Sequence, residues 1–354
     1  MKLLIITKDF PDNSTGRTYV LWALARFLGW EAKVVSTRDG EVWGPVATPE
    51  FVGACESIPE GDSRWNSYAA EADLTIAAKP LPGTLGFAHE LVGKVGRPLL
   101  VDIDDPDIEA VLSQGKPLRA LVKMVRGGSY WPTRRLVPLV KKYPVMVSNP
   151  ALQKRYGGVL VPHARVDSGA GSPHTTGEPT IAFVGTNRPH KGVEVLRESA
   201  RTAGPTPMSL TITDIAPEDA TPNENWVGQT SLSRGVDIVK QSDIVVIPSV
   251  RTSAYSAAQL PVKIIDAMLA GRAIVVSDFE PLAWAIGDFG IVVPPGDVAR
   301  LSLALEELRD PARRADLGGR ARERALATFT VPSVASQFAE ACRGAVAADA
   351  DRGE

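Results

Sequence analysis

The sequence predicts an α/β protein of two domains, each built on a parallel β-sheet with helices on both faces. The chain has 354 residues, which is too long for one ordinary domain of roughly 100–200 residues. It is 44% hydrophobic and 23% charged, a balance typical of globular proteins, which excludes disordered and coiled-coil classes. Short apolar runs alternate with amphipathic stretches, and this alternation restarts near residue 180. Together these observations predict two open, parallel α/β sheets.

The first half opens with an apolar run at 2–7, which suits a strand buried on both faces. A helix follows, because apolar residues recur at helical spacing from Val20 to Leu28. A second strand at 32–36 completes a β-α-β unit. We expect further strands at 74–78, 98–103, 145–148 and 158–161, and a helix near 84–95.

The second half repeats this pattern after a polar, breaker-rich segment at 169–179, which we interpret as a linker. The predicted organisation is a first domain at 1–168, a second at 180–330, and a C-terminal helix in 331–354. That helix is expected to cross back to the first domain and to end in a flexible tail. We predict strands at 180–184, 208–212, 244–247 and 273–276, and helices near 191–202, 232–241, 262–270 and 298–308.

Several classes of protein are excluded by what the chain lacks. No apolar run reaches the roughly 18–20 residues that span a bilayer, and the N-terminal apolar run is too short for a signal peptide. The two cysteines, Cys55 and Cys342, cannot build a disulfide scaffold. The glycine motifs of dinucleotide-binding and P-loop proteins are absent. We therefore expect a cytoplasmic protein with no cofactor and no metal.

A first candidate site follows the strand at 180–184, in the run from Gly185 to Gly192. Glycines there allow backbone N–H groups at a helix start to approach an anion, and Arg188 and Lys191 add positive charge. This pattern predicts a diphosphate site. The alternative is a surface turn with solvated basic residues.

A second candidate lies on the predicted helix after Pro261. Ile264, Ile265 and Met268 form its buried face, while Asp266 falls off that face near the helix start. A carboxylate there can accept hydrogen bonds from two neighbouring hydroxyl groups. Gly271 ends the helix before the next buried strand.

Taken in order, these segments resemble the donor domain of retaining GT-B glycosyltransferases, in particular glycosyltransferase family 4. The resemblance also rests on Pro248-Ser249, the small-residue loop after it, the Pro261-x-Lys263-x-x-Asp266 helix, and the run 290–297. It implies a GT-B fold, with two Rossmann-like domains facing across a cleft. It also implies transfer of a sugar, with retained configuration, from a nucleotide-sugar to an acceptor hydroxyl, with UDP favoured over GDP.

The resemblance assigns roles position by position. Asp266 would bind the donor ribose, and Ala258, Gln259 and Leu260 would form the loop beside the donor sugar and phosphate. Two positions depart from the family: Thr186 replaces its arginine, with Arg188 as the candidate substitute, and Ala258 replaces its first glutamate. These departures keep two alternatives open, a GT-B epimerase and a non-catalytic nucleotide-sugar-binding homologue. The residues assigned to the donor diphosphate are Gly16, Gly185, Thr186, Arg188 and Lys191.

Asp104 and Asp105 are the candidate catalytic residues of the first domain. They follow the strand at 98–103, at the sheet edge where open α/β proteins bind ligands, and they replace the family's histidine there. Either carboxylate could orient an acceptor hydroxyl or accept its proton. The alternative is that they cap a helix.

No acidic residue lies between Glu109 and Asp167. Within this stretch, residues 110–142 combine basic, aliphatic and aromatic residues, which suits an anionic membrane surface or an anionic acceptor. A solvated helix face is the third interpretation. Nucleic acid is excluded as a partner, because the net charge is −2 and no recognition motif occurs. The expected partners are a nucleotide-sugar donor and a sugar, lipid-linked or small-molecule acceptor.

Overall fold

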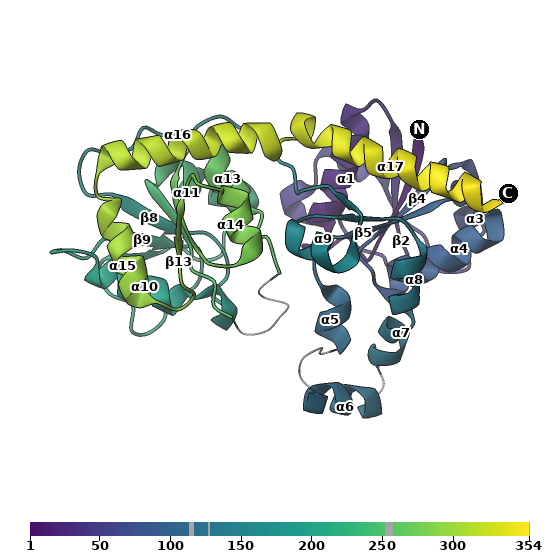
Figure 1. Ribbon diagram of the computed structural model, residues 1–354, viewed down its shortest axis with the longest axis horizontal. Helices are drawn as coiled ribbons and strands as arrows, with labels where there is room; N and C mark the ends of the chain where they lie inside the picture. The colour runs from purple at the N-terminus through teal and green to yellow at the C-terminus, as the bar shows by residue number, and fades with distance from the viewer. Residues whose placement is uncertain (113–116, 127, 252–257, 354) are drawn as a thin grey trace. The chain divides into compact units, whose positions relative to one another are not determined.

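The computed structural model describes residues 1–112, 117–126, 128–251 and 258–353 (Figure 1). Contacts divide the chain into two compact units. The first unit contains Met1–Ala164 together with Val331–Glu354, and the second contains Arg165–Thr330. Each unit holds one parallel β-sheet between two layers of helices, as the alternation of apolar runs predicts.

The first unit has a seven-stranded sheet in the order β3-β2-β1-β4-β5-β6-β7. All neighbouring strands are parallel, with Ile5 at the centre paired to Val34 on one side and Ile76 on the other. Side chains of the central strands are buried on both faces, which is why these strands read as unbroken apolar runs. The strands are β1 (Lys2–Thr7), β2 (Glu31–Ser36), β3 (Cys55–Ser57), β4 (Leu74–Ala78), β5 (Leu99–Ile103), β6 (Val145–Val147) and β7 (Val159–Leu160).

Helices cover both faces of this sheet. One face packs against α1, α2 and α17, where Leu24 and Phe338 join the same core as Ile5. The other face packs against α3, α4, α8 and α9. The helices are α1 (Thr15–Phe27), α2 (Pro49–Ala54), α3 (Arg64–Glu71), α4 (Phe87–Val95), α8 (Leu136–Lys142), α9 (Pro150–Tyr156) and α17 (Val331–Gly353), with a 3-10 turn η1 (Gly44–Val46) and a π-turn η2 (Pro82–Gly86).

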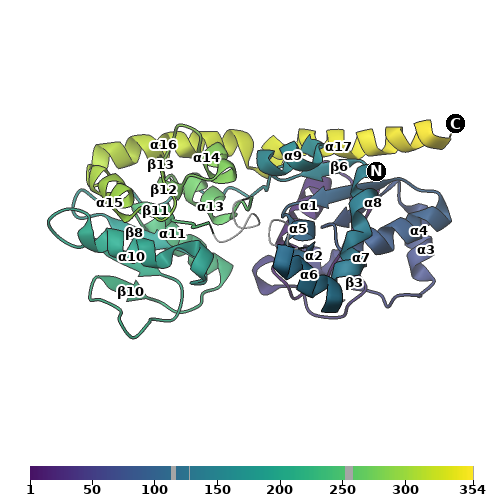
Figure 2. The same ribbon diagram turned by 60° about the horizontal axis from the view of Figure 1, so that its bottom comes forward.

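Three helices of the first unit form an insertion between β5 and α8. They are α5 (Asp107–Leu112), α6 (Pro117–Arg126) and α7 (Tyr130–Arg134). Figure 1 shows α6 standing away from the sheet of this unit, and Figure 2 shows the same helices with the bottom of that view brought forward. Val122 and Val125 are exposed on α6, as is Trp131 on α7.

The second unit has a six-stranded parallel sheet in the order β10-β9-β8-β11-β12-β13. Its centre is formed by β8 and β11, where Ile181 pairs with Ile244. The strands are β8 (Thr180–Phe183), β9 (Ser209–Ile212), β10 (Glu224–Trp226), β11 (Ile244–Ile247), β12 (Ala273–Ser277) and β13 (Ile291–Val293).

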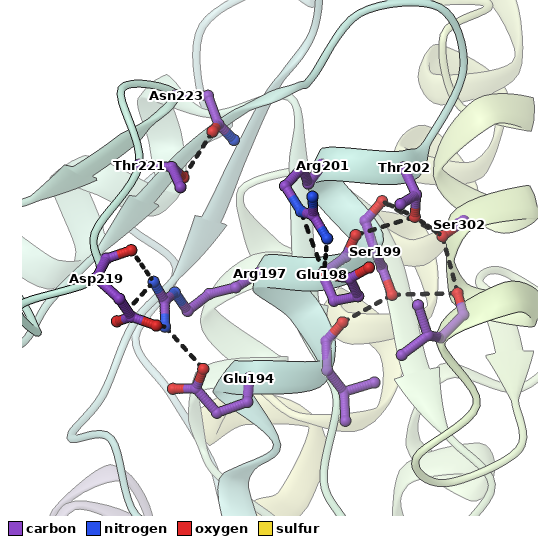
Figure 3. Close-up of polar contacts among 12 residues, drawn as sticks. Glu194, Arg197, Glu198, Ser199, Arg201, Thr202, Asp219, Thr221, Asn223 and Ser302 are labelled. Atoms are coloured by element: carbon purple, nitrogen blue, oxygen red, sulfur yellow. Dashed lines mark hydrogen bonds and ion pairs between the residues drawn. The ribbon is translucent and has the colours of Figure 1, made fainter.

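Two helix layers enclose this second sheet. Helices α10 and α15 cover one face, and α11, α13, α14 and α16 pack on the other. Figure 3 shows how α10 is fixed: Arg197 contacts Glu194 and Asp219, while Ser199 and Ser302 join α10 to α15. The helices are α10 (Val193–Thr202), α11 (Leu232–Gln241), α13 (Lys263–Leu269), α14 (Glu280–Ile286), α15 (Val298–Glu307) and α16 (Pro311–Thr328), with a 3-10 turn η3 (Pro189–Lys191).

Two segments named in the sequence analysis have the following places in the structure. Residues 169–179, expected as a linker, lie in the second unit, where the Gly171 amide donates to the Ala270 carbonyl and the Thr175 amide donates to Asp243. The end of the chain, expected as a flexible tail, is helical to Gly353.

Within the described ranges, no helix is both long and apolar enough to cross a bilayer. In the same part of the chain, no three His, Cys, Asp or Glu side chains are arranged to bind a metal ion.

Candidate functional site

Strand order predicts where ligands bind in both units. Each sheet reverses its winding direction beside the strand that begins it, between β1 and β4 in the first unit and between β8 and β11 in the second. In open α/β sheets, ligands bind at the carboxyl ends of the strands that flank such a reversal. The residues that follow β8 and β11 are therefore the predicted ligand-binding residues of the second unit.

The loop after β8 is tied down by its own amides. The Gly185 amide donates to Thr213 Oγ1 at 2.6 Å, and the Asn187 amide donates to the Asp214 carboxylate. The Lys191 amide donates to the Arg188 carbonyl at 2.7 Å. These three N–H groups donate within the protein. The side chains of Arg188 and Lys191 therefore matter most as donors to an anion in this loop.

Gly192 brings this loop against the segment after β11. It has a φ of 69°, in the left-handed region, and a Cβ atom there would collide with the Pro248 carbonyl. The Val250 amide donates to the His190 carbonyl at 2.9 Å. The two loops therefore meet at the strand ends where the reversal predicts a site.

Lys263 reaches the same place from the start of α13. Its ammonium group donates to the Val184 carbonyl and lies 5.6 Å from the centre of the Phe183 ring. The φ of Gly185 is 144°, which disfavours any side chain there, and an added Cβ atom would displace Lys263 Nζ. Burial, together with the nearby positive charge of Lys191, lowers the pKa of Lys263 to about 7.

Asp266 lies in the first turn of α13, as expected, but it is not free. Arg165 donates from Nε to Asp266 Oδ1 at 2.9 Å and from Nη2 to Oδ2 at 3.4 Å. Both side chains are largely buried. Burial raises the pKa of Asp266, and Arg165 counteracts that rise. A carboxylate has about four acceptor positions, so this one can still accept hydroxyl hydrogen bonds.

The remaining residues assigned to the donor differ in how far they are buried. Thr186 and Arg188 are exposed. Ala258 and Gln259 are half-buried, and the side chain of Leu260 packs into the same core cluster as Ile264. The small-residue loop at 252–257 lies outside the described residues.

In the first unit, Gly16 lies in the first turn of α1, directly after the loop in which it was expected. Its amide donates to the Asn13 carbonyl at 3.1 Å. An added Cβ atom would meet the Trp43 ring at 3.5 Å, an ordinary contact distance.

Asp104 and Asp105 lie in a charged cluster at the ends of β4 and β5. Lys79 Nζ is 2.7 Å from Asp104 Oδ1, 3.1 Å from Asp105 Oδ2 and 3.3 Å from Asp107 Oδ2. Lys79 is the non-glycine residue with positive φ, 72°, in the described part of the chain. A left-handed lysine costs on the order of 1–2 kcal/mol, which indicates a position imposed by its surroundings.

The cluster holds its carboxylates in different states. Burial opposes ionisation of Asp104, but Lys79 and His163 outweigh it and lower the pKa of that carboxyl. Burial, with the charges of Asp104 and Asp105, raises the pKa of Asp107 to about 7 in spite of Lys79. One carboxylate is therefore charged at neutral pH beside another that is near its midpoint, a pairing suited to handling a proton.

A buried ion pair between Arg17 and Asp102 lies next to this cluster. Arg17 on α1 donates to the Asp102 carboxylate, at 2.7 Å for its shortest bond, and to the carbonyls of Val161 and Pro162. Its side chain is 1% exposed, and that of Asp102 is 0% exposed. The pair links α1 to β5 and to the end of β7, and so fixes the strand that carries Asp104.

Four of these residues were missed from sequence: Lys79, Lys263, Arg165 and Arg17. Two of them carried a signal. Lys263 lies at the start of a helix, where a positive charge is unfavourable, and Lys79 directly follows an apolar strand. Arg17 and Arg165 carried none, because their partners Asp102 and Asp266 are 85 and 101 positions away.

Most of the second unit matches a known protein family. Residues 178–310 match the family model described as "Glycosyl transferases group 1". Over 97% of this chain and 100% of the other, the structure is similar to HepE from Anabaena in complex with UDP, with a TM-score of 0.74 and 16% identity. The fold is that of the GT-B glycosyltransferases.

Other GT-B structures agree over most of the chain. Sucrose-phosphate synthase from Thermosynechococcus elongatus covers 98% of this chain and 100% of its own, with a TM-score of 0.66 and 17% identity. A glycosyltransferase from Rickettsia africae covers 98% of each chain, with a TM-score of 0.68 and 11% identity. No curated protein matches the sequence. The family match and the GT-B fold together support a GT-B glycosyltransferase.

Proposed function

We propose that this protein transfers a sugar from a nucleotide-sugar, with UDP favoured over GDP, to an acceptor hydroxyl with retained configuration. The second unit would bind the donor and the first unit the acceptor. The observation that carries the proposal is the convergence of Lys191 and Asp266 on the carboxyl ends of β8 and β11, within the segment that matches the glycosyltransferase model.

The donor side needs a cation for the diphosphate and acceptors for the ribose. Lys191 ends the 3-10 turn η3 after β8 and supplies positive charge. Asp266 supplies carboxylate oxygens for the ribose hydroxyls, and Arg165 favours its charged form. HepE has been crystallised with UDP and with UDP-glucose, which supports UDP as the first nucleotide to test.

The acceptor side is assigned to the carboxylates held by Lys79. Asp104 and Asp105 can accept a hydrogen bond from the acceptor hydroxyl and so orient its oxygen. The departing phosphate can then take the proton, so that the protein supplies orientation and electrostatic stabilisation rather than a covalent intermediate. Retention follows when the acceptor attacks the face that the diphosphate leaves.

Calorimetry and product analysis test this proposal. Wild-type protein should bind UDP, and Lys191→Met and Asp266→Asn should each weaken binding by at least about 10-fold, the effect of losing about 1.4 kcal/mol. The matched control is Arg234→Met, which removes an exposed cation on α11. With UDP-glucose and a panel of sugar acceptors, NMR should detect an α-linked product. Interconversion of UDP-glucose without acceptor would instead indicate an epimerase, and absence of UDP and GDP binding would contradict the proposal.

We also propose that residues 110–142 contact an anionic membrane and bring the protein to a lipid-linked acceptor. In the described part of this stretch, the exposed apolar residues Val122, Val125 and Trp131 lie among basic residues. An amphipathic surface of this kind gains from both apolar burial and attraction to anionic lipid. Residues 113–116 and 127 of the stretch lie outside the described residues. The exposed basic side chains are Lys123, Arg134, Arg135, Lys141 and Lys142.

Vesicle sedimentation tests this contact. The protein should sediment with vesicles containing phosphatidylglycerol and remain in solution with pure phosphatidylcholine. The double variant Val125→Asp with Trp131→Asp should lose sedimentation, while Val52→Asp, an exposed valine elsewhere in the first unit, should not. Equal sedimentation of both variants would contradict the proposal.

A further inference from the structure

The loop after β8 lacks the arginine that the resembling family places directly after its glycine. Thr186 occupies that position here. Arg188, two residues later, is exposed, and its carbonyl is used to accept the Lys191 amide. A donor diphosphate carries at least two negative charges, so Lys191 needs a second cation close to it.

Lys263 is the cation that the fold brings to this point. It comes from α13, far along the chain, yet its ammonium group contacts the backbone of Val184 where the loop leaves β8. The absence of a side chain at Gly185 makes room for it, since a Cβ atom there would collide with Nζ. Gly185 and Lys263 are 78 positions apart in sequence, yet the space left by the missing side chain of the glycine is filled by the ammonium group of the lysine. A lysine that merely extended into solvent would not need this space.

The charge of Lys263 is only partly compensated by its charged neighbours. Lys191 opposes the charged form of Lys263 and Asp266 favours it, but Asp266 forms its ion pair with Arg165. In the ranges that the structure describes, no carboxylate forms an ion pair with Lys263. Two lysines near each other in a partly desolvated position oppose each other's charge. An anion bound between them removes that opposition and favours the charged form of both.

We propose that Lys263, rather than Arg188, is the second cation that binds the donor diphosphate, acting together with Lys191. This inference rests on the proposed function. It assigns Lys263 direct contact with the phosphate oxygens, and it makes Gly185 the residue that gives the ammonium group access to them.

Calorimetry with UDP and UMP separates the candidates. Lys263→Met should weaken UDP binding by at least 10-fold and UMP binding by less, because UMP lacks the second phosphate. Arg188→Met and the control Arg234→Met should each change UDP affinity by less than 3-fold. Adding Thr186→Arg to Lys263→Met should restore much of the UDP affinity, because it returns an arginine to the family's position.

Proton uptake gives a readout on the unaltered protein. Lys263 is partly neutral near pH 7.5, since its pKa is about 7, so UDP binding should take up a fraction of one proton. Calorimetry at pH 7.5 in phosphate and in Tris, whose ionisation enthalpies differ, measures this uptake. Lys263→Met should abolish it.

The outcomes are distinguishable. If Lys191→Met weakens UDP binding while Lys263→Met matches Arg234→Met, this inference is wrong and the proposed function stands. If Lys263→Met weakens UMP binding as much as UDP binding, the inference is also overturned, because Lys263 then does not act on the second phosphate. If wild-type protein binds neither UDP nor GDP, the proposed function fails and this inference fails with it.

Discussion

Arg165 donates a hydrogen bond from its Nε to Oδ1 of Asp266 across 2.9 Å, within the second unit. The carboxylate assigned to the ribose is thus held by the residue at which the chain enters that unit. Arg165 is fixed in turn, because its amide donates to the Phe329 carbonyl at 2.8 Å. The ion pair opposes the effect of burial on Asp266, which otherwise favours the protonated acid.

Replacing Arg165 should therefore make nucleotide binding depend on pH. In Arg165→Met, burial acts on Asp266 against the charge of Lys263 but no longer against that of Arg165, so the pKa of Asp266 rises further. A protonated carboxyl accepts hydrogen bonds poorly, and UDP affinity should fall as pH decreases from 8 to 6, by about 10-fold relative to wild type. Calorimetry at both pH values measures this. A parallel pH dependence in wild type and variant would contradict it.

Asp107→Asn should stabilise the first unit, and more at high pH than at low pH. The folded pKa is about 7 against an ordinary 3.8, so the folded state binds this proton more tightly than the unfolded state. Stability from this group is fully present below about pH 4 and is lost as pH rises through 7. Asparagine removes that loss, so the increase in Tm over wild type should be several degrees at pH 8 and clearly smaller at pH 5.

Differential scanning calorimetry at pH 5 and pH 8 measures this shift in Tm. Asp39→Asn, at an exposed position of the first unit, is the matched control and should change Tm at neither pH. A lower Tm for Asp107→Asn at both pH values would show that its bond to Lys79 matters more than its charge.

Arg17→Met should strongly destabilise the first unit. Arg17 and Asp102 are both fully buried, so losing the guanidinium leaves an uncompensated carboxylate, which costs about 3–5 kcal/mol. Arg17→Met combined with Asp102→Leu should recover part of this loss, because neither member of the pair then leaves an unpaired buried charge. Urea unfolding followed by the fluorescence of the buried Trp22 and Trp65 measures it. A double variant less stable than Arg17→Met would contradict the electrostatic explanation.

Gly185→Ala should reduce UDP binding without unfolding the protein. Its φ of 144° disfavours any side chain, and the added Cβ atom would displace the ammonium group of Lys263. We expect UDP affinity to fall by about 10-fold or more, as measured by calorimetry. Gly319→Ala is the control: this glycine lies in α16 with open space around it, so alanine should raise stability by about 0.5–1 kcal/mol and leave binding unchanged.

Much of the fold could be predicted because its signals are local. Strands buried on both faces, such as β1 and β11, must be apolar throughout, and this makes them visible in the sequence. The short edge strands β3 and β10 were not predicted, because they are half-buried and polar and form only through pairing with β2 and β9. The hydrogen bonds of segment 169–179 could not be predicted for the same reason, since their partners Asp243 and Ala270 are distant in sequence.

By itself, the sequence determined the two parallel α/β units and the positions of Lys191 and Asp266 near the ends of apolar strands. Only the tertiary structure decided what those residues contact. Arg165 reaches Asp266, Lys263 reaches the loop at Gly185, and Lys79 gathers the carboxylates after β5. These contacts could not be predicted because they depend on distances between segments that only folding brings together. Hydrophobic periodicity, in contrast, is a local property of the sequence.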